Sequence, residues 1–250
     1  FVDIAFRGAA KTTRTKLFFA FCIANDLDHS RKYLKVLSAD QGNAKQNVTD
    51  VYTLLINQNI RPFYPEIFEK TPEKREETMA SFTTATGVKM QAGSVGMDQR
   101  GDIQEESRPD LIWFDDFETR KTLRSAVVTQ AIWDNMEEAR NGLAKNGGSI
   151  YNCNYLSERG NVHKLVEKHK ARTLITPIRG ADGKPTWPAA YTRSEINIIE
   201  AAAEDFAGEY LCEPSAGADI FFDRSCVDRQ FKKTPVKIIA DFKIFHLFNP

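Results

Sequence analysis

Apolar and polar residues follow two different periods along the chain. Short continuous apolar runs, typical of buried strands, are followed by longer segments in which apolar residues recur every three or four positions, as in helices. The expected strands are 1–5, 33–39, 111–114, 149–154 and 171–177. The expected helices are 11–25, 43–59, 125–141 and 161–169. Because strands alternate with helices, we expect an α/β fold with a mainly parallel sheet and helices on both faces.

Three segments depart from this alternation. Residues 81–85 and 88–92, separated by Thr86-Gly87, predict a hairpin, and the segment 60–78 before it is a connection. After Pro188 the pattern changes, and two helices over 193–203 and 204–212 predict a small lid.

The helix expected over 11–25 has Leu17, Ala20, Phe21 and Ala24 on one face. The spacing of these four residues is that of one helix face.

The pattern divides the chain into three parts. We expect a core over 1–188, a helical lid over 189–214 and a linker over 215–250. Both ends of the sequence fall within strand-like runs, so we expect the protein to continue beyond them.

Composition excludes several classes of protein. The chain has 250 residues, of which 42% are apolar and 27% charged, as in ordinary globular proteins. Its net charge is zero, so any contact with nucleic acid has to be local. The four Cys are far apart and form no C-x-x-C, which favours reduced thiols over a zinc site. No apolar run has the length of a membrane span.

The first candidate site is the loop 5–12, between a strand and a helix. It has the layout of the phosphate-binding pattern G-x-x-x-x-G-K-[ST], with Ala5 and Ala10 at the two glycine positions. Lys11 would reach the β- and γ-phosphates and Thr12 would supply a hydroxyl for Mg²⁺. Alanine at position 10 is tolerable only if that residue does not need a positive φ. A chance strand–turn–helix is the alternative.

The second candidate is the apolar run that ends in acids, 109–118. Carboxylates at the carboxyl edge of a parallel sheet lie where ligands bind. Asp115 would hold the Mg²⁺ shell, and a second carboxylate would orient and deprotonate the attacking water. Asp116 has the usual sequence offset for that role, whereas Glu118 has the longer reach. A strand followed by a solvated acidic turn is the alternative.

Two further features are open to more than one interpretation. Arg100 beside Gly101 could complete the active site of a neighbouring subunit, or it could be a solvated loop residue. Asn152 and Asn154, at the end of an apolar strand, could sense the γ-phosphate or the attacking water. Alternatively, Asn154 and Ser157 could cap the next helix.

Taken in order, these motifs resemble the ATPase domain of the large terminase subunit of tailed bacteriophages, the motor that packages DNA into procapsids. Residues 6–12 resemble the family loop P-R-G-x-G-K-[ST], except at Phe6 and Ala10. Arg100-Gly101 followed by 108–118 resembles its acidic block. Residues 150–154 resemble its coupling strand without the commoner Gly-Thr, and the later stretches "PTWPAAYTRSEI" and "FAGEYLCEP" resemble the end of its ATPase region.

The resemblance implies an additional-strand P-loop NTPase that uses ATP and Mg²⁺. The nucleotide-binding residues would be Arg7, Gly8, Ala9, Ala10, Lys11, Thr12 and Thr13. Thr12 and Asp115 would hold the metal. The catalytic residues would be Arg7, Arg100, Asp116, Glu118 and Asn154.

The resemblance also implies partners and a place of action. The expected partners are double-stranded DNA, the portal protein and procapsid, the small terminase subunit and further copies of the chain in a ring, without a membrane. The expected location is the host cytoplasm, transiently at the portal vertex. An endonuclease domain would begin near 237–250, and an adenine-binding segment would precede the chain. The alternatives are a helicase-type DNA translocase and a P-loop fold that clamps DNA without hydrolysing ATP.

Overall fold

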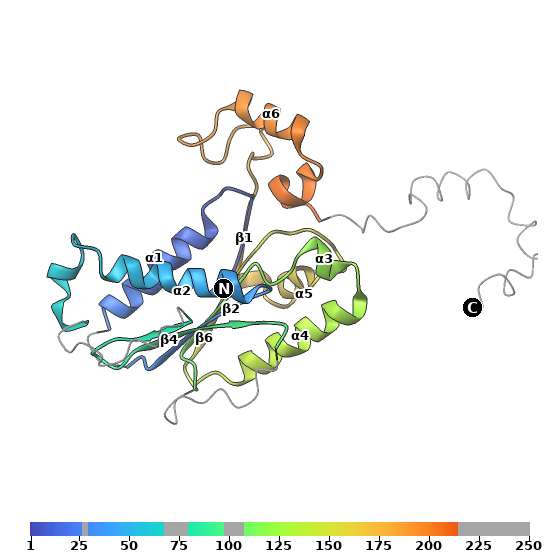
Figure 1. Ribbon diagram of the computed structural model, residues 1–250. Helices are drawn as coiled ribbons and strands as arrows, with labels where there is room; N and C mark the ends of the chain where they lie inside the picture. Colours follow the sequence, from blue (N-terminus) through green and yellow to red (C-terminus); the bar gives the residue numbers. More distant parts are fainter. Residues whose placement is uncertain (27–29, 68–79, 98–107, 215–250) are drawn as a thin grey trace, which may run out of the picture. The chain divides into compact units, whose positions relative to one another are not determined.

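Seven strands form one sheet in the residues that the computed structural model describes, 1–26, 30–67, 80–97 and 108–214 (Figure 1). In chain order they are β1 Val2–Ala5, β2 Tyr33–Ser38, β3 Ser81–Thr83, β4 Lys89–Ser94, β5 Leu111–Asp115, β6 Gly148–Cys153 and β7 Thr173–Thr176. Their order across the sheet is β3-β4-β2-β5-β6-β1-β7. Only β3, which forms the expected hairpin with β4, pairs antiparallel.

The position of β6 identifies the type of sheet. β6 lies between β1, which precedes the loop, and β5, which ends in the acids. An additional strand therefore separates the two strands that carry the candidate site. This order confirms the predicted fold class, an α/β fold of the additional-strand P-loop type.

Helices cover both faces of the sheet. They are α1 Lys11–Ala24, α2 Gln41–Leu55, α3 Arg120–Leu123, α4 Ala126–Asn141, α5 Asn161–Lys168 and α6 Arg193–Ala202. Single turns of 3₁₀-helix lie at η1 Arg61–Phe63, η2 Pro65–Ile67 and η3 Lys170–Arg172, and a π-helix at η4 Ala207–Leu211.

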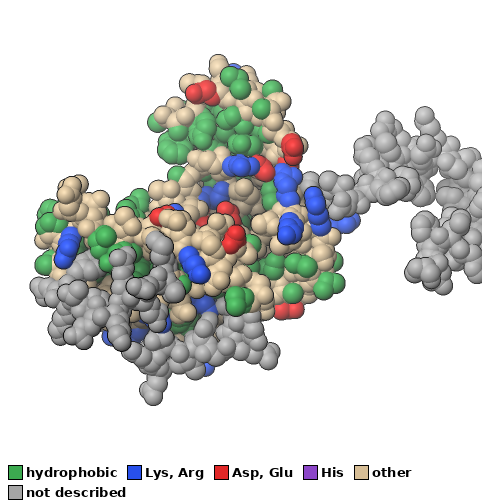
Figure 2. All heavy atoms as spheres, in the orientation of Figure 1, with side chains coloured by type: hydrophobic (Ala, Val, Ile, Leu, Met, Phe, Trp, Pro, Cys, Tyr) green, Lys and Arg blue, Asp and Glu red, His purple; other side chains and the backbone are tan. Residues whose placement is uncertain are grey.

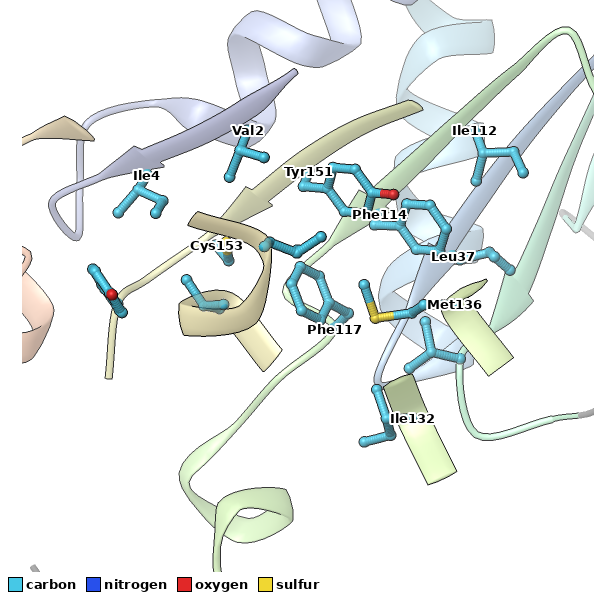
Figure 3. Packing of buried hydrophobic residues seen from close by; sticks show 14 of the residues in the cluster. Val2, Ile4, Leu37, Ile112, Phe114, Phe117, Ile132, Met136, Tyr151 and Cys153 are labelled. Atoms are coloured by element: carbon cyan, nitrogen blue, oxygen red, sulfur yellow. The ribbon is translucent and has the colours of Figure 1, made fainter. Parts of the chain in front are cut away.

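The side chains of β5 alternate between two hydrophobic clusters. Ile112 and Phe114 pack on the face covered by α4 and α5, where the ring of Phe114 stacks on Tyr151 with centroids 4.7 Å apart (Figure 3). Trp113 packs on the other face, against Phe19 of α1. Since both faces are buried, β5 is apolar throughout until its last residue, Asp115, reaches the edge of the sheet.

The apolar face of α1 that the sequence spacing indicates is only partly buried. Leu17 and Phe21 are 52% and 63% exposed, whereas Phe19 and Ile23 are buried against the sheet. The helix has apolar residues on more than one side, so spacing alone does not identify the buried stripe.

The residues after β7 pack onto the loop between β1 and α1. Phe6 and Ala9 of the loop join a third cluster with Ile178 and Ile196. Helix α6 begins at a capping box formed by Thr192 and Glu195, as its sequence favours. The second predicted lid helix, over 204–212, is reduced to the π-helix η4.

The described residues belong to one compact unit, Phe1–Ala216, and the predicted linker lies outside them. In these residues no helix has the length and apolar character needed to cross a membrane. Cys22, Cys153 and Cys212 are buried free thiols, and Cys226 lies outside the described residues.

Candidate functional site

The loop between β1 and α1 contains two residues in the left-handed region. Gly8 has φ +93°, which favours glycine, and a Cβ on it would lie 2.5 Å from the hydroxyl oxygen of Tyr191, so a larger residue would also have to displace that side chain. Ala10, the residue before α1, has φ 56° and ψ 30°. The condition under which alanine would be tolerable at this position, a negative φ, is therefore not met. Ala10 adopts a conformation that costs an L-residue free energy.

A cavity of about 360 Å³ opens over this loop. It is lined by Arg7, Gly8, Ala9, Ala10, Lys11, Thr12, Asp116 and Asn154. The structure thus brings together residues from the loop, the acidic turn after β5 and the end of β6. Thr13 is exposed on the first turn of α1 and does not line the cavity. Arg100 lies outside the described residues.

Lys11 connects the ends of two neighbouring strands. Its Nζ donates to the carbonyl oxygen of Ala5, at the end of β1, and to Oδ1 of Asn154, just after β6, both at 2.7 Å. Burial lowers the pKa of Lys11, while the negative charge of Asp116 opposes this shift. A third, longer contact joins Nζ to the carbonyl oxygen of Phe6 at 3.4 Å, so the half-buried ammonium has oxygen partners for all three of its donors.

Thr12 and Asp115 join the loop to the acidic strand. The Thr12 hydroxyl donates to Oδ1 of Asp115 at 3.1 Å, and Nδ2 of Asn47 donates to Oδ2 at 2.8 Å. Burial and the neighbouring charge of Asp116 raise the pKa of Asp115 to about 6. The sequence interpretation missed Asn47. Its signal was a polar residue in the buried stripe of α2, next to Val48 and one turn before Val51.

The oxygen atoms of Thr12 and Asp115 fit a magnesium ion. Mg²⁺ prefers oxygen ligands and commonly takes one or two from the protein, with water and phosphate oxygens completing its shell. The described residues contain no group of three or more His, Cys, Asp or Glu side chains suited to a metal. A site here would therefore depend on the phosphates of a nucleotide.

The two candidates for the water-activating carboxylate lie in different surroundings. Asp116 lines the cavity, and burial raises its pKa against the opposing charges of Lys11 and Arg7. Glu118 is not among the residues that line the cavity; its Oε2 accepts the backbone N–H of Asn161, at the start of α5. Burial raises the pKa of Glu118 to about 7. The geometry therefore brings only Asp116 to the loop.

Arg7 takes part in an ion-pair network that the sequence interpretation missed. Its Nη1 lies 2.9 Å from Oε2 of Glu209, and Oε1 of Glu209 lies 3.0 Å from Nη2 of Arg120. Arg120 also contacts Asp205 at 3.0 Å. Figure 2 shows acidic and basic side chains side by side where the segment after β7 meets the rest of the unit. No spacing in the sequence relates Arg7 to an acid 202 residues away.

Asn152, within β6, and Asn154, directly after it, make different contacts, and neither caps α5. Asn154 contacts Lys11, as described above, while Asn152 is buried and its Oδ1 accepts the Thr15 hydroxyl at 3.0 Å. The N-cap residue of α5 is Gly160, which has no side chain to cap the helix. The Ser157 hydroxyl instead accepts the backbone N–H of Arg159.

Known proteins resemble this chain in structure but not in sequence. No protein-family model matches the sequence, and no curated protein matches it. The large terminase of a thermophilic bacteriophage, in complex with ADP, has a TM-score of 0.53 at 10% identity, covering 84% of this chain and 46% of that chain. The fold of this chain is similar to that of large terminases.

Two further solved structures of large terminases are similar to this chain in fold. The large terminase of bacteriophage HK97 has a TM-score of 0.53 at 12% identity, covering 85% of this chain and 46% of that chain. A mutant of the ATPase domain of Thermus phage P74-26 large terminase has a TM-score of 0.51 at 9% identity, covering 86% of this chain and 88% of that chain. The chain thus spans about half of the ADP-bound terminase and of the HK97 terminase, and most of the P74-26 ATPase domain.

Proposed function

We propose that this chain is the ATPase domain of a large-terminase-type motor, which hydrolyses ATP to move double-stranded viral DNA into a procapsid. The observation that carries the proposal is the contact between Thr12 and Asp115 beside the cavity. It joins a loop suited to phosphate to an acidic strand suited to Mg²⁺. The similarity to a terminase structure with bound ADP supports the same assignment.

ATP would bind with its phosphates in the cavity over the loop. The first backbone N–H groups of α1 have no partner within the helix and attract phosphate, which the helix dipole also favours. Lys11 would exchange its contact with Asn154 or the Ala5 carbonyl for a phosphate oxygen. A magnesium ion held through Thr12 and Asp115 would neutralise charge on the phosphates.

Hydrolysis would use Asp116 as the base. Its carboxylate would accept a proton from the attacking water as the oxygen of that water bonds to the γ-phosphorus and the bond to the β-phosphate oxygen breaks. Burial, which raises the pKa of Asp116, makes it a stronger base than a solvated aspartate. Asn154, beside Lys11, would orient the water or the γ-phosphate.

The remaining parts of the proposal follow from the likeness to terminases. The chain would act on double-stranded DNA with the portal protein, the procapsid and the small terminase subunit, as a ring of copies. Its place of action would be the host cytoplasm and then the portal vertex. An endonuclease would belong to a further domain of the same protein.

A phosphate-release assay, with and without DNA, tests the proposal. Lys11→Ala and Asp116→Asn should abolish turnover, whereas Glu118→Gln should retain it. Lys184→Ala is a matched control, because that side chain is 82% exposed and lies outside the cavity. Near wild-type turnover in Lys11→Ala would exclude the loop as the hydrolysis site.

One observation favours a second candidate, a P-loop fold that clamps DNA without hydrolysis. Ala10 in the left-handed region places strain in the loop that has to hold the phosphates. DNA binding without ATP turnover by the wild-type chain would support this candidate. A helicase-type translocase would differ by DNA-stimulated turnover that portal and procapsid do not increase.

The role of Arg100 as a residue that acts on a neighbouring subunit stays a prediction. Mixing Arg100→Ala subunits with Lys11→Ala subunits would restore part of the turnover, because some interfaces would pair an intact Lys11 with an intact Arg100. If a mixed ring stays inactive, Arg100 does not act between subunits.

A further inference from the structure

A second cavity, of about 410 Å³, lies at the edge of the sheet opposite the phosphate loop. Residues that line it come from the start of β1 and β6, the end of α4 and the turn before β7, and include Phe1, Arg140, Ser149, His169 and Arg172. The amino ends of parallel strands meet at this edge, and the carboxyl ends meet at the loop. Among the described residues, none lines both cavities.

The side chains around this cavity give it a positive charge. None of the described residues that line it is acidic, while Arg140 and Arg172 are positively charged. Burial and the nearby charge of Arg140 lower the pKa of His169, so the two guanidinium groups supply the charge. Arg172 is exposed and has no ion pair with any described residue. Glu137, just outside the lining, pairs with Arg140 at 2.6 Å but also with Lys168 at 2.7 Å, so one carboxylate faces two cations. The positive charge therefore does not depend on the amino group of Phe1.

Two buried nitrogen atoms of lining residues lack a hydrogen-bond partner among the described residues. They are Nε of Arg140, whose Nη2 holds Glu137, and Nε2 of His169. Buried polar groups in proteins are nearly always hydrogen-bonded, so Nε of Arg140, which can only donate, indicates a missing acceptor. Nε2 of His169 can donate to the same acceptor in one tautomer of the neutral ring. The hydroxyl of Tyr151, 3.2 Å from that of Ser149, is a further polar group in the lining. Together these groups suit an anion with several acceptor oxygens.

We propose that this cavity binds a phosphate group, held by the guanidinium groups of Arg140 and Arg172 and by the ring of His169. Guanidinium groups present planar pairs of donors that match phosphate oxygens, and they keep their charge at any pH at which the protein is folded. The phosphate could come from the DNA backbone or from free inorganic phosphate. The site is separate from the hydrolysis site, and the proposal holds whether or not the chain hydrolyses ATP.

Calorimetric titration with inorganic phosphate tests the site. The Lys11→Ala chain is the background, because this substitution weakens phosphate binding in the loop. We expect saturable binding to remain, and Arg172→Ala to weaken it by about tenfold or more, as loss of a charge-assisted contact does. Lys184→Ala, an equal change of charge outside the lining, should alter the affinity by less than about twofold. His169→Gln keeps the size of the side chain roughly and should also weaken binding.

Titration with a short DNA duplex then distinguishes the source. The phosphate belongs to DNA if Arg172→Ala lowers DNA affinity more than Lys184→Ala does. In that case the slope of the logarithm of DNA affinity against the logarithm of salt concentration should also become shallower, by the amount that one phosphate contact contributes. If only inorganic phosphate binding falls, the ligand is free phosphate. The proposal is wrong if Lys11→Ala alone removes all phosphate binding. It is also wrong if Arg172→Ala and His169→Gln, with circular dichroism unchanged, leave that binding intact.

Discussion

Replacing Ala10 with glycine isolates the strain in the loop between β1 and α1. Ala10 has φ 56°, a backbone conformation that glycine adopts without a steric penalty and alanine does not. The side chain is only a methyl group, and it makes no capping hydrogen bond to α1. Ala10→Gly therefore changes the backbone energy and little else.

The expected gain is the difference between two opposing effects. The left-handed conformation costs an L-residue about 1–2 kcal/mol, which glycine avoids. Glycine also makes the unfolded chain more flexible, which costs about 0.4–1 kcal/mol of stability. The free energy of unfolding should thus rise by about 0.5–1 kcal/mol, and Tm by roughly 1–4 °C for a unit of this size.

Urea unfolding of Ala10→Gly and of Ala9→Gly measures the effect. Ala9 is the matched control, since it is buried, adjacent and has a negative φ. Ala9→Gly should lower stability by about 1–2 kcal/mol through lost burial and added flexibility. ADP affinity of Ala10→Gly should stay within about threefold of wild type, because the loop keeps its conformation. A loss of stability in Ala10→Gly similar to that in Ala9→Gly would refute the left-handed conformation.

Three further predictions concern the acids around the loop. Burial raises the pKa of Glu118 from 4.5 to about 7, so the native state binds more protons than the unfolded chain between these values and wild-type stability should fall as pH rises through them. In Glu118→Gln, the free energy of unfolding measured in urea should fall by about 3 kcal/mol less over this pH range than in the wild type. If the pH dependence is the same as in the wild type, Glu118 is not buried. Asp115→Asn should lower the rate of Mg²⁺-dependent phosphate release by about a hundredfold or more. The same variant should unfold at a higher urea concentration at pH 7, because burial raises the pKa of Asp115 to about 6 and its ionised form therefore destabilises the native state. Glu209→Gln should lower the free energy of unfolding by less than about 1 kcal/mol, because the side chain of its partner Arg7 is 67% exposed. It should also tighten ADP binding a few-fold, because Arg7 is released from the ion pair; weaker ADP binding would contradict this.

The sequence predicted the sheet well because the central strands β1, β2 and β5 are buried along nearly their whole length. A strand such as β5 has to be apolar at successive positions, and this continuous run is visible without a structure. The hairpin of β3 and β4 was equally clear, since Gly87, at φ +89°, supplies the turn that Thr86-Gly87 predicted. The order of strands followed from recognising the motifs in sequence rather than from the hydrophobic pattern.

The residues that meet at the candidate site were named from the sequence where they follow a motif and missed where they come from elsewhere in the chain. Lys11, Thr12 and Asp116 have fixed places beside strand ends, and all three line the cavity. Asn47 and Glu209 reach the site from α2 and η4, and their contacts depend on tertiary packing. The positive φ of Ala10 was signalled only by its place at a glycine position of the loop pattern, because alanine itself gives no sign of its conformation.

The separation of Asp116 from Glu118 follows from one backbone angle. Asp116 has φ 43°, in the region that aspartate enters more readily than most L-residues. The chain turns there, and the next residue, Phe117, is fully buried against Phe114 and Tyr151 (Figure 3). Once Phe117 is anchored, Glu118 lies at the start of α5 rather than at the loop. The same turn that brings one carboxylate to the cavity therefore removes the other, which sequence spacing alone left undecided.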